Sequence, residues 1–245
     1  MVFLKKDKDE YSPGVVAVIV AAGKGERLKG ESGIAKQYLK IGEQSVLEIC
    51  LQKFLGKPEI DSVLVVINKD HEDTFLPIYQ NLKKSFGSKL VYTYGGPRRQ
   101  DSVKNALDAL KVFNPEKVLI HDASRIFVTD EQILETISLL NNYSAVTLAQ
   151  KATDTMYEID DERVSSINRE NTYCFLTPQA FEFSAISAAH EKFKDHEFTD
   201  DMGLYFMTGE NNFTILNAEG DNFKITQHSD FIKAKDRFEK GKEKV

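Results

Sequence analysis

Glycines and basic side chains gather directly after the first strongly apolar run of the chain, Val15–Val20. The segment that follows, Ala21–Tyr38, places glycines at Gly23 and Gly25. Glycine has no Cβ and tolerates positive φ, so such a backbone can approach phosphate oxygens closely. The segment also holds four basic residues against two acidic ones, and the basic ones are Lys24, Arg27, Lys29 and Lys36. This composition predicts a binding loop for a polyanion.

Two common phosphate-binding motifs do not fit this loop. A dinucleotide-binding turn has the spacing G-x-G-x-x-G, and Leu28 stands where its third glycine belongs. A P-loop needs a lysine after its last glycine, and Glu31 stands there instead. On composition alone, a flexible glycine loop with solvated charges stays open as an alternative.

Asp122 comes directly after another apolar run, Lys117–His121. Open parallel sheets bind ligands at the carboxyl ends of their strands. A hard cation such as Mg²⁺ is held by one or two carboxylates together with substrate phosphates. Asp122 is therefore a candidate metal ligand, with a turn or helix cap as the alternative. His121 is expected to pack beneath the site, and no His/Cys cluster suits zinc.

Short apolar runs alternate with segments of helical period along the chain. Beyond the first run, the predicted strands are Ser62–Ile67, Leu90–Thr93, Lys117–His121 and Ala145–Leu148. The spacing of one buried helix face is followed by Val103, Ala106, Leu107 and Leu110. This alternation predicts an α/β fold with a Rossmann-like open, mostly parallel sheet and helices on both faces.

Residues 151–173 interrupt this alternation. They are too polar for a core element, and the turn Asp160–Glu162 lies between two patterned segments. We expect a protruding β-arm of the kind that packs on a second subunit. The alternation then resumes, so residues 1–245 are expected to form one domain with an arm at about 151–173.

Composition narrows the class of protein further. The chain has 245 residues, 41% hydrophobic and 29% charged, with a net charge of −6. An acidic balance argues against non-specific nucleic-acid binding, which needs a basic surface. The sequence has neither an 18-residue apolar window nor an apolar N-terminal leader, so neither a membrane span nor secretion is expected. Two cysteines without metal-type spacing, Cys50 and Cys174, suit a reduced cytoplasmic setting.

Several segments together resemble one family. They lie in order between about residues 15 and 238: Ala21–Tyr38, Gly95–Val103, His121–Arg125, Asp154-Thr155, Asn168-Arg169, Thr177–Gln179, Thr199–Asp201 and Glu219–Thr226. The chain resembles the nucleotidyltransferases that join a nucleoside triphosphate to a sugar phosphate, and among them the 2-C-methyl-D-erythritol 4-phosphate cytidylyltransferases. The resemblance implies transfer of the cytidylyl group of CTP to that polyol phosphate with release of pyrophosphate, a divalent cation such as Mg²⁺, and a homodimer joined through the arm.

The resemblance also assigns roles to residues. The catalytic cations would be Arg27, Lys36 and Lys224, and the metal ligand Asp122. CTP would be bound by Ala21, Ala22, Gly23, Gly25, Gly95, Gly96, Asp101 and Ser102. The polyol phosphate would be bound by Arg125, Thr155, Arg169, Thr177 and Thr199. Local alternatives remain: Gly95-Gly96 as a tight turn, Ser102 as a helix cap, Arg169 as a surface ion pair, and Thr177-Pro178 as a strand end.

The chain departs from the family pattern near the phosphate loop. Ala35 and Ile126 stand where the family usually has proline, and the stretch between Arg27 and Lys36 is about two residues longer than usual. None of these changes removes a charged group, so we expect altered loop ordering and weaker CTP affinity in an active enzyme. A fused cyclodiphosphate synthase domain is not expected.

Three other functions are alternatives to the one that the resemblance implies. A ribitol-5-phosphate cytidylyltransferase shares most of the motifs. An NAD-dependent oxidoreductase is disfavoured by the missing third glycine. A non-catalytic nucleotide-binding module would not need all the cations together.

Overall fold

The centre of the molecule is a strand that is apolar on both faces. The computed structural model describes residues 13–25, 34–161, 163–218 and 220–242. In it, β1 (Val15–Ala21) lies between β6 (Lys117–Asp122) and β4 (Ser62–Ile67), pairing in parallel with both. A strand buried on both sides by helices has to be apolar throughout, and this explains the continuous run in the sequence.

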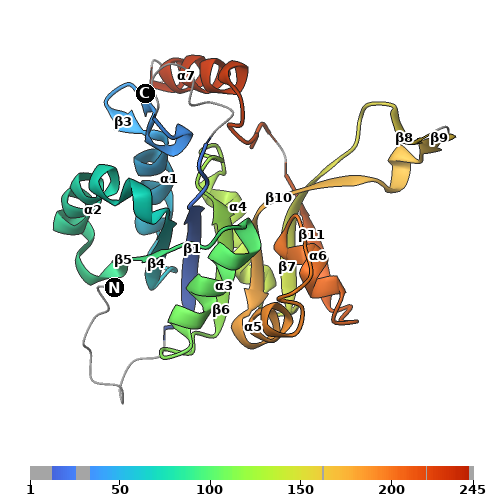
Figure 1. The fold of residues 1–245 in the computed structure, drawn as a ribbon, viewed down its shortest axis with the longest axis horizontal. Helices are drawn as coiled ribbons and strands as arrows, with labels where there is room; N and C mark the ends of the chain where they lie inside the picture. Colours follow the sequence, from blue (N-terminus) through green and yellow to red (C-terminus); the bar gives the residue numbers. More distant parts are fainter. Residues whose placement is uncertain (1–12, 26–33, 162, 219, 243–245) are drawn as a thin grey trace.

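The sheet extends outward from this strand in both directions (Figure 1). Its seven described strands have the order β11-β7-β10-β6-β1-β4-β5. The outer members are β5 (Leu90–Tyr94), β10 (Tyr173–Glu182), β7 (Ala145–Lys151) and β11 (Phe213–Asn217). Among the seven described strands of this sheet, only β10 runs antiparallel to its neighbours. The open, mostly parallel sheet predicted from the sequence is confirmed.

Helices cover both faces of the sheet and bury two apolar clusters against it. One cluster packs α1 (Val46–Leu55), α2 (Glu72–Phe86) and α4 (Asp130–Leu139) on one face. The other packs α3 (Arg99–Leu110), α5 (Phe183–Lys192) and α6 (Asp201–Phe206) on the opposite face. The predicted buried face of α3 is confirmed, because Val103 and Ala106 are fully buried there.

Short elements connect these layers. Near the end toward which β1 runs they are η3 (Lys36–Tyr38), β2 (Lys40–Ile41), β3 (Gln44–Ser45), η4 (Lys69–His71) and η6 (Arg169–Asn171), whereas η5 (Gly87–Lys89) lies at the opposite end, directly before β5. The last helix, α7 (His228–Lys242), lies beyond the end toward which β1 runs (Figure 1). Ser45 starts α1 with a reciprocal capping box to Glu48, which satisfies amide groups that the first helical turn leaves without partners.

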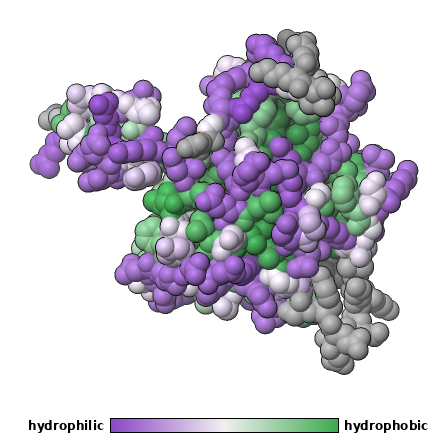
Figure 2. Space-filling model, turned by 180° about the vertical axis from the view of Figure 1, so that it is seen from behind, coloured by the Kyte–Doolittle hydropathy of each residue, from purple (hydrophilic) through white to green (hydrophobic). Residues whose placement is uncertain are grey.

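The arm predicted at 151–173 projects away from the body (Figures 1 and 2). Its tip is the antiparallel pair β8 (Met156–Asp160) and β9 (Arg163–Ile167). Large apolar side chains are exposed on it, including Ile159 (72%) and Val164 (65%). The arm therefore presents apolar surface that its own chain does not cover.

No helix in the described part of the chain is both long and apolar enough to cross a membrane.

Candidate active site

The turn after β1 is held in shape by a buried glutamine. Gln37, in η3, donates from Nε2 to the carbonyl oxygens of Ala21 and Gly23, each at 2.9 Å. Gly25 has φ +65°, and a Cβ there would lie 2.8 Å from the Lys36 amide nitrogen. Only glycine fits this conformation without strain. The described start of the predicted phosphate loop, Ala21–Gly25, therefore has a defined path at the carboxyl end of β1. Arg27 lies outside the described residues.

The glycine pair after β5 comes against this turn. A Cβ on Gly95 would lie 2.4 Å from Ala22 Cβ and 2.6 Å from Ser102 Oγ. A Cβ on Gly96 would lie 2.5 Å from Asp101 Cβ. Such distances are too short for any side chain, so both glycines are required for close approach. The sequence predicted that these two loops serve one ligand, and the fold brings them into contact.

Asp101 and Ser102 form hydrogen bonds with residues at and just before the start of α3. Ser102 Oγ accepts from the Gly96 amide at 3.1 Å and donates to the Arg98 carbonyl at 3.0 Å. Asp101 bonds the Arg98 guanidinium at 2.6 and 2.9 Å, and that hydrogen bonding lowers the pKa of its carboxyl. Both side chains hold the Gly95-Gly96 turn, so they shape the predicted nucleotide loop from within.

Asp122 ends β6 beside the phosphate turn, because Val20 of β1 is its register partner. Its carboxylate faces three cations: Lys224 Nζ lies 2.8 Å from Oδ2, Arg99 Nε 3.1 Å from Oδ1, and Arg125 Nε 3.9 Å from Oδ2. Burial opposes ionisation, but Arg99 and Lys224 outweigh it and hold the pKa of Asp122 well below its usual range. The carboxylate is therefore charged at any physiological pH.

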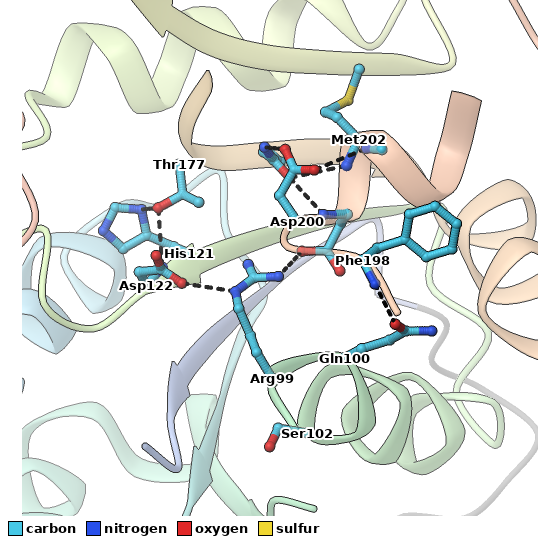
Figure 3. A network of polar contacts seen from close by, with 12 residues as sticks. Arg99, Gln100, Ser102, His121, Asp122, Thr177, Phe198, Asp200 and Met202 are labelled. Carbon is cyan, nitrogen blue, oxygen red and sulfur yellow. Dashed lines mark hydrogen bonds and ion pairs between the residues drawn. The ribbon is translucent and has the colours of Figure 1, made fainter. Parts of the chain in front are cut away.

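Arg99 and Asp201 extend this cluster into the interior, and Figure 3 shows Arg99 reaching Asp122. Arg99 bridges two carboxylates, with NH1 2.8 Å from Asp201 Oδ2 while its Nε bonds Asp122. His190 Nε2 donates to the other Asp201 oxygen at 3.1 Å, and both residues are 1% exposed. Sequence reasoning quoted Arg99 and Asp201 within motifs but gave neither a role. The signal available was their place, each in the first turn of a helix.

His121 and Thr177 support Asp122 from below. His121 Nε2 lies 3.0 Å from the Arg125 carbonyl oxygen, so this nitrogen carries the proton, and Nδ1 accepts from the Thr177 hydroxyl at 3.1 Å. Thr177 Oγ1 in turn accepts from the Asp122 amide at 3.1 Å. Burial lowers the pKa of His121 to about 4, so its imidazole is neutral. The expected packing of His121 beneath the site is confirmed.

The pocket around these residues has a volume of about 330 Å³. Five predicted site residues line it, namely Asp122, Arg125, Thr177, Thr199 and Lys224. Four further residues complete the wall: Arg99, Phe175, Gln179 and Asp200.

Gln179 belongs to the segment Thr177–Gln179, and the sequence predicts no role for it. Its amide bonds Asp200 at 2.7 Å and accepts from the amides of Asp201 and Met202, so it fixes the start of α6.

The remaining predicted residues divide into two groups. Lys36 lies near the cluster, with Nζ donating to the Ile225 carbonyl at 2.7 Å. Thr155 and Arg169 lie on the arm, where Arg169 donates to the Thr153 carbonyl at 3.1 Å. The pocket of the same chain is not lined by these arm residues. The fold thus brings the predicted body residues together, whereas Thr155 and Arg169 on the arm lie outside the pocket of their own chain.

The donor set suits one kind of metal. Within the described ranges there is no group of three or more His, Cys, Asp or Glu side chains able to hold an ion. A pocket with the carboxylates of Asp122 and Asp200 in its wall fits Mg²⁺, because this ion is held by one or two carboxylates, keeps waters and takes other ligands from substrate phosphates.

A glycine-lined turn beside a pocket of cations is built to bind phosphates, and the absence of a third glycine argues against hydride transfer from a dinucleotide. These features define a nucleotidyltransferase. The family model for 2-C-methyl-D-erythritol 4-phosphate cytidylyltransferase matches residues 15–240. The chain belongs to this family.

Individual relatives agree with the family match. A 2-C-methyl-D-erythritol 4-phosphate cytidylyltransferase of Thermotoga neapolitana is 36% identical over 217 residues, 88% of this chain and 92% of that protein. A bifunctional IspD/IspF enzyme of Wolbachia pipientis is 37% identical over 234 residues, 94% of this chain but 57% of that protein. The chain therefore spans little more than half the length of such bifunctional relatives.

A solved structure agrees as well. The 4-diphosphocytidyl-2C-methyl-D-erythritol synthase of Anaerococcus prevotii superposes with a TM-score of 0.80 at 33% identity, covering 93% of this chain and 97% of that one.

Proposed function

We propose that the protein transfers the cytidylyl group of CTP to 2-C-methyl-D-erythritol 4-phosphate and releases pyrophosphate, a step of non-mevalonate isoprenoid precursor biosynthesis. One observation carries this proposal. In this chain, which belongs to the cytidylyltransferase family, the ionised Asp122 lies in a pocket with Lys224, Arg99 and Arg125 within 4 Å of its carboxylate. Such a concentration of fixed positive charge is what a reaction between two phosphate polyanions needs.

In the reaction, an oxygen of the polyol phosphate forms a bond to the α-phosphorus of CTP, and the bond from that phosphorus to pyrophosphate breaks. Negative charge accumulates on the oxygens around the phosphorus. Lys224 is suited to neutralise it, because its side chain is 36% exposed while that of Asp122 is 10% exposed. Its ammonium can turn toward a phosphate while the carboxylate stays in place.

The nucleotide would lie along the two glycine loops. Backbone groups of the Ala21–Gly25 turn would face the triphosphate, and the Gly95-Gly96 turn would receive the cytosine. Arg27 and Lys36 are proposed as further cations for the triphosphate. Asp122 would hold Mg²⁺ together with the phosphates, and the ion would supply further neutralisation of their charge.

The polyol phosphate would occupy the 330 Å³ pocket. Thr177 and Thr199 would contact it, and Arg125 would contribute charge. Arg169 and Thr155 would come from the arm of a second copy of the chain, forming a homodimer. The exposed apolar side chains Tyr157, Ile159 and Val164 on the arm support such a contact. A bidentate arginine suits phosphate capture.

The test follows pyrophosphate release from CTP and Mg²⁺ with methylerythritol phosphate or ribitol phosphate offered separately. Release with the first compound only is expected, since the relatives named above carry its name. Release with ribitol phosphate alone would overturn the substrate assignment. CTP binding without release from either would favour a non-catalytic module. The cytoplasmic location and the single-domain organisation stay predictions.

A further inference from the structure

Lys224 lies in a segment without regular secondary structure. Residues 221–226 belong to neither helix nor strand and connect the region after β11 to α7. A lysine on an irregular segment reaches a fixed point only if neighbouring elements hold its backbone. The contacts on both sides of this segment therefore decide where the Lys224 ammonium lies.

The body holds the segment through two of its backbone positions. The Ile225 amide donates to the Ser124 carbonyl at 2.9 Å, and Ile225 is fully buried. Arg125 donates to the Asn222 carbonyl at 2.8 Å, and Asn222 Nδ2 donates to the Thr177 carbonyl at 3.0 Å. These bonds place the residues on either side of Phe223 and Lys224 against the carboxyl end of β6 and against Thr177 of the antiparallel neighbour β10.

Helix α7 holds the segment from the other side by placing two cations over an aromatic stack that the segment forms with Phe127. Phe223, the residue before Lys224, stacks on Phe127 with ring centroids 5.2 Å apart and planes at 29°. Lys233 Nζ lies 4.4 Å from the centre of the Phe223 ring, and Arg237 Cζ lies 4.4 Å from the centre of the Phe127 ring. Lys233 and Arg237 are one helical turn apart, so one face of α7 supplies both cations.

Asp221 connects the same two cations to the backbone of the segment. Its carboxylate lies 2.8 Å from Lys233 Nζ and 3.5 Å from Arg237 NH1. Arg237 also donates to the Asp221 carbonyl at 2.8 Å. We call Asp221, Phe223, Lys233 and Arg237, together with Phe127, the α7 clamp. Each cation of the clamp thus has a carboxylate on one side and a ring on the other.

We propose that the α7 clamp positions Lys224 for phosphoryl chemistry, so that the C-terminal helix is part of the catalytic apparatus without touching substrate. This inference rests on the proposed function of the site. Lys224 has a long flexible side chain, and its charge is useful only at the point where negative charge develops. Fixing Phe223 fixes the Cα from which that side chain starts.

The first experiment compares Arg237→Gln and Lys233→Gln with Lys240→Gln, which removes a cation from the same helix that pairs only with Asp236 among the contacts described. We expect the two clamp variants to lower kcat about tenfold with KM for CTP changed little, because a small displacement of a catalytic cation affects the transition state most. Lys240→Gln should match wild type. Equal kcat in all four proteins would overturn the proposal.

A second comparison separates positioning from general support of the fold. Phe223→Tyr keeps the ring and should keep kcat near wild type. Phe223→Leu keeps apolar bulk but loses the ring face, so it should lower kcat. In a Lys224→Ala background, Phe223→Leu should cost almost nothing further, because the group it positions is gone. If Phe223→Leu lowered kcat by the same factor in both backgrounds, a role through Lys224 would be contradicted.

Amide hydrogen exchange across residues 221–226 tests the clamp without any substrate. Exchange should be faster in Arg237→Gln and unchanged in Lys240→Gln. If wild type released no pyrophosphate, the proposed function would be wrong and exchange alone would decide the clamp. Faster exchange limited to the segment in clamp variants would support the clamp, and unchanged exchange would overturn it.

Discussion

The pocket and the arm differ in where the contacts of their side chains come from. Around Asp122, side chains from β6, α3, α6 and the segment before α7 converge through ion pairs between residues far apart in the sequence. Figure 3 shows the pair of Arg99 and Asp122 among them. On the arm, β8 and β9 pair mainly with each other, and their apolar side chains are exposed. The charged cluster of the pocket forms within one chain, whereas the arm presents groups that only a second molecule would cover.

This contrast teaches where each kind of substitution should act. Changes in the pocket should alter folding stability and catalysis of every single chain. Changes on the arm should leave the folded chain intact and act through association. The predictions below test this division, beginning with the largest expected effect.

Arg99→Met should destabilise the fold by about 3–5 kcal/mol, since it removes the cation that bridges two buried carboxylates and weakens the compensation of their charge. The carboxylates concerned are Asp122 and Asp201, 7% and 1% exposed. Chemical denaturation at neutral pH measures the change. A loss no greater than that of a surface substitution would contradict the importance of the bridge.

The same variant should change the response to acid. Arg99 contributes to the lowered pKa of both Asp122 and Asp201, so their stabilising effect is complete above the unfolded pKa of about 4 and is lost as the pH falls below it. The stability difference between wild type and Arg99→Met should therefore shrink in acid. A difference independent of pH between neutral and about pH 3 would show that charge is not the cause.

Lys224→Ala should lower kcat by about 10²–10³, the usual cost of removing one group that stabilises transition-state charge. Its exposure makes a large loss of folding stability unexpected. Steady-state pyrophosphate release together with thermal unfolding separates the two effects. Lys240→Ala serves as the control, and activity near wild type in Lys224→Ala would remove Lys224 from the mechanism.

Arg169→Ala should weaken kcat/KM for the polyol phosphate by about 10- to 100-fold, the range for a hydrogen bond to a charged group, with KM for CTP unchanged. Mixing it with Asp122→Asn offers a sharper test. If the arm serves the neighbour's pocket in a twofold dimer, mixed dimers hold one intact site and an equal mixture recovers about a quarter of wild-type activity. No recovery after exchange of subunits would place Arg169 outside the shared site.

Val164→Asp should change the stability of the folded chain by less than about 0.5 kcal/mol, as expected for an exposed position. It should nevertheless weaken self-association, because a dimer would bury the new charge. Val112→Asp is the matched control, since Val112 is 66% exposed and Val164 65%. Light scattering after gel filtration should show a smaller mass for the arm variant only. Identical masses would argue against an arm-mediated dimer.

Predictions from the sequence were strongest where local chemistry dictates structure. The apolar run Val15–Val20 is the central strand, and the spacing of Val103 and Leu110 marks the buried face of α3. Gly25 adopts positive φ, as its place in a phosphate turn suggested. Asp122, at the end of its strand, lies at the carboxyl edge of the sheet as expected.

Sequence reasoning missed residues whose role depends on long-range packing. Arg99 looks like any helix-start arginine until β6 and α6 bring two carboxylates to it. Gln179 gains its role because α6 begins beside β10. That Asp101 and Ser102 contact the nucleotide stays a prediction, and the structure adds that their hydrogen bonds hold the loop predicted to bind it.

The order of apolar and polar residues by itself determined β1, β4, β5, β6 and β7, the buried face of α3 and the glycine turns, because these depend on neighbours a few positions away. It also determined the total charge and the residue types available to a phosphate ligand. Tertiary structure alone decided which cations meet at Asp122, since their mutual distances arise from the packing of α3, α6 and the segment before α7 on one sheet edge. Electrostatic strength falls with distance and rises with burial, so the site exists only once those elements have folded together.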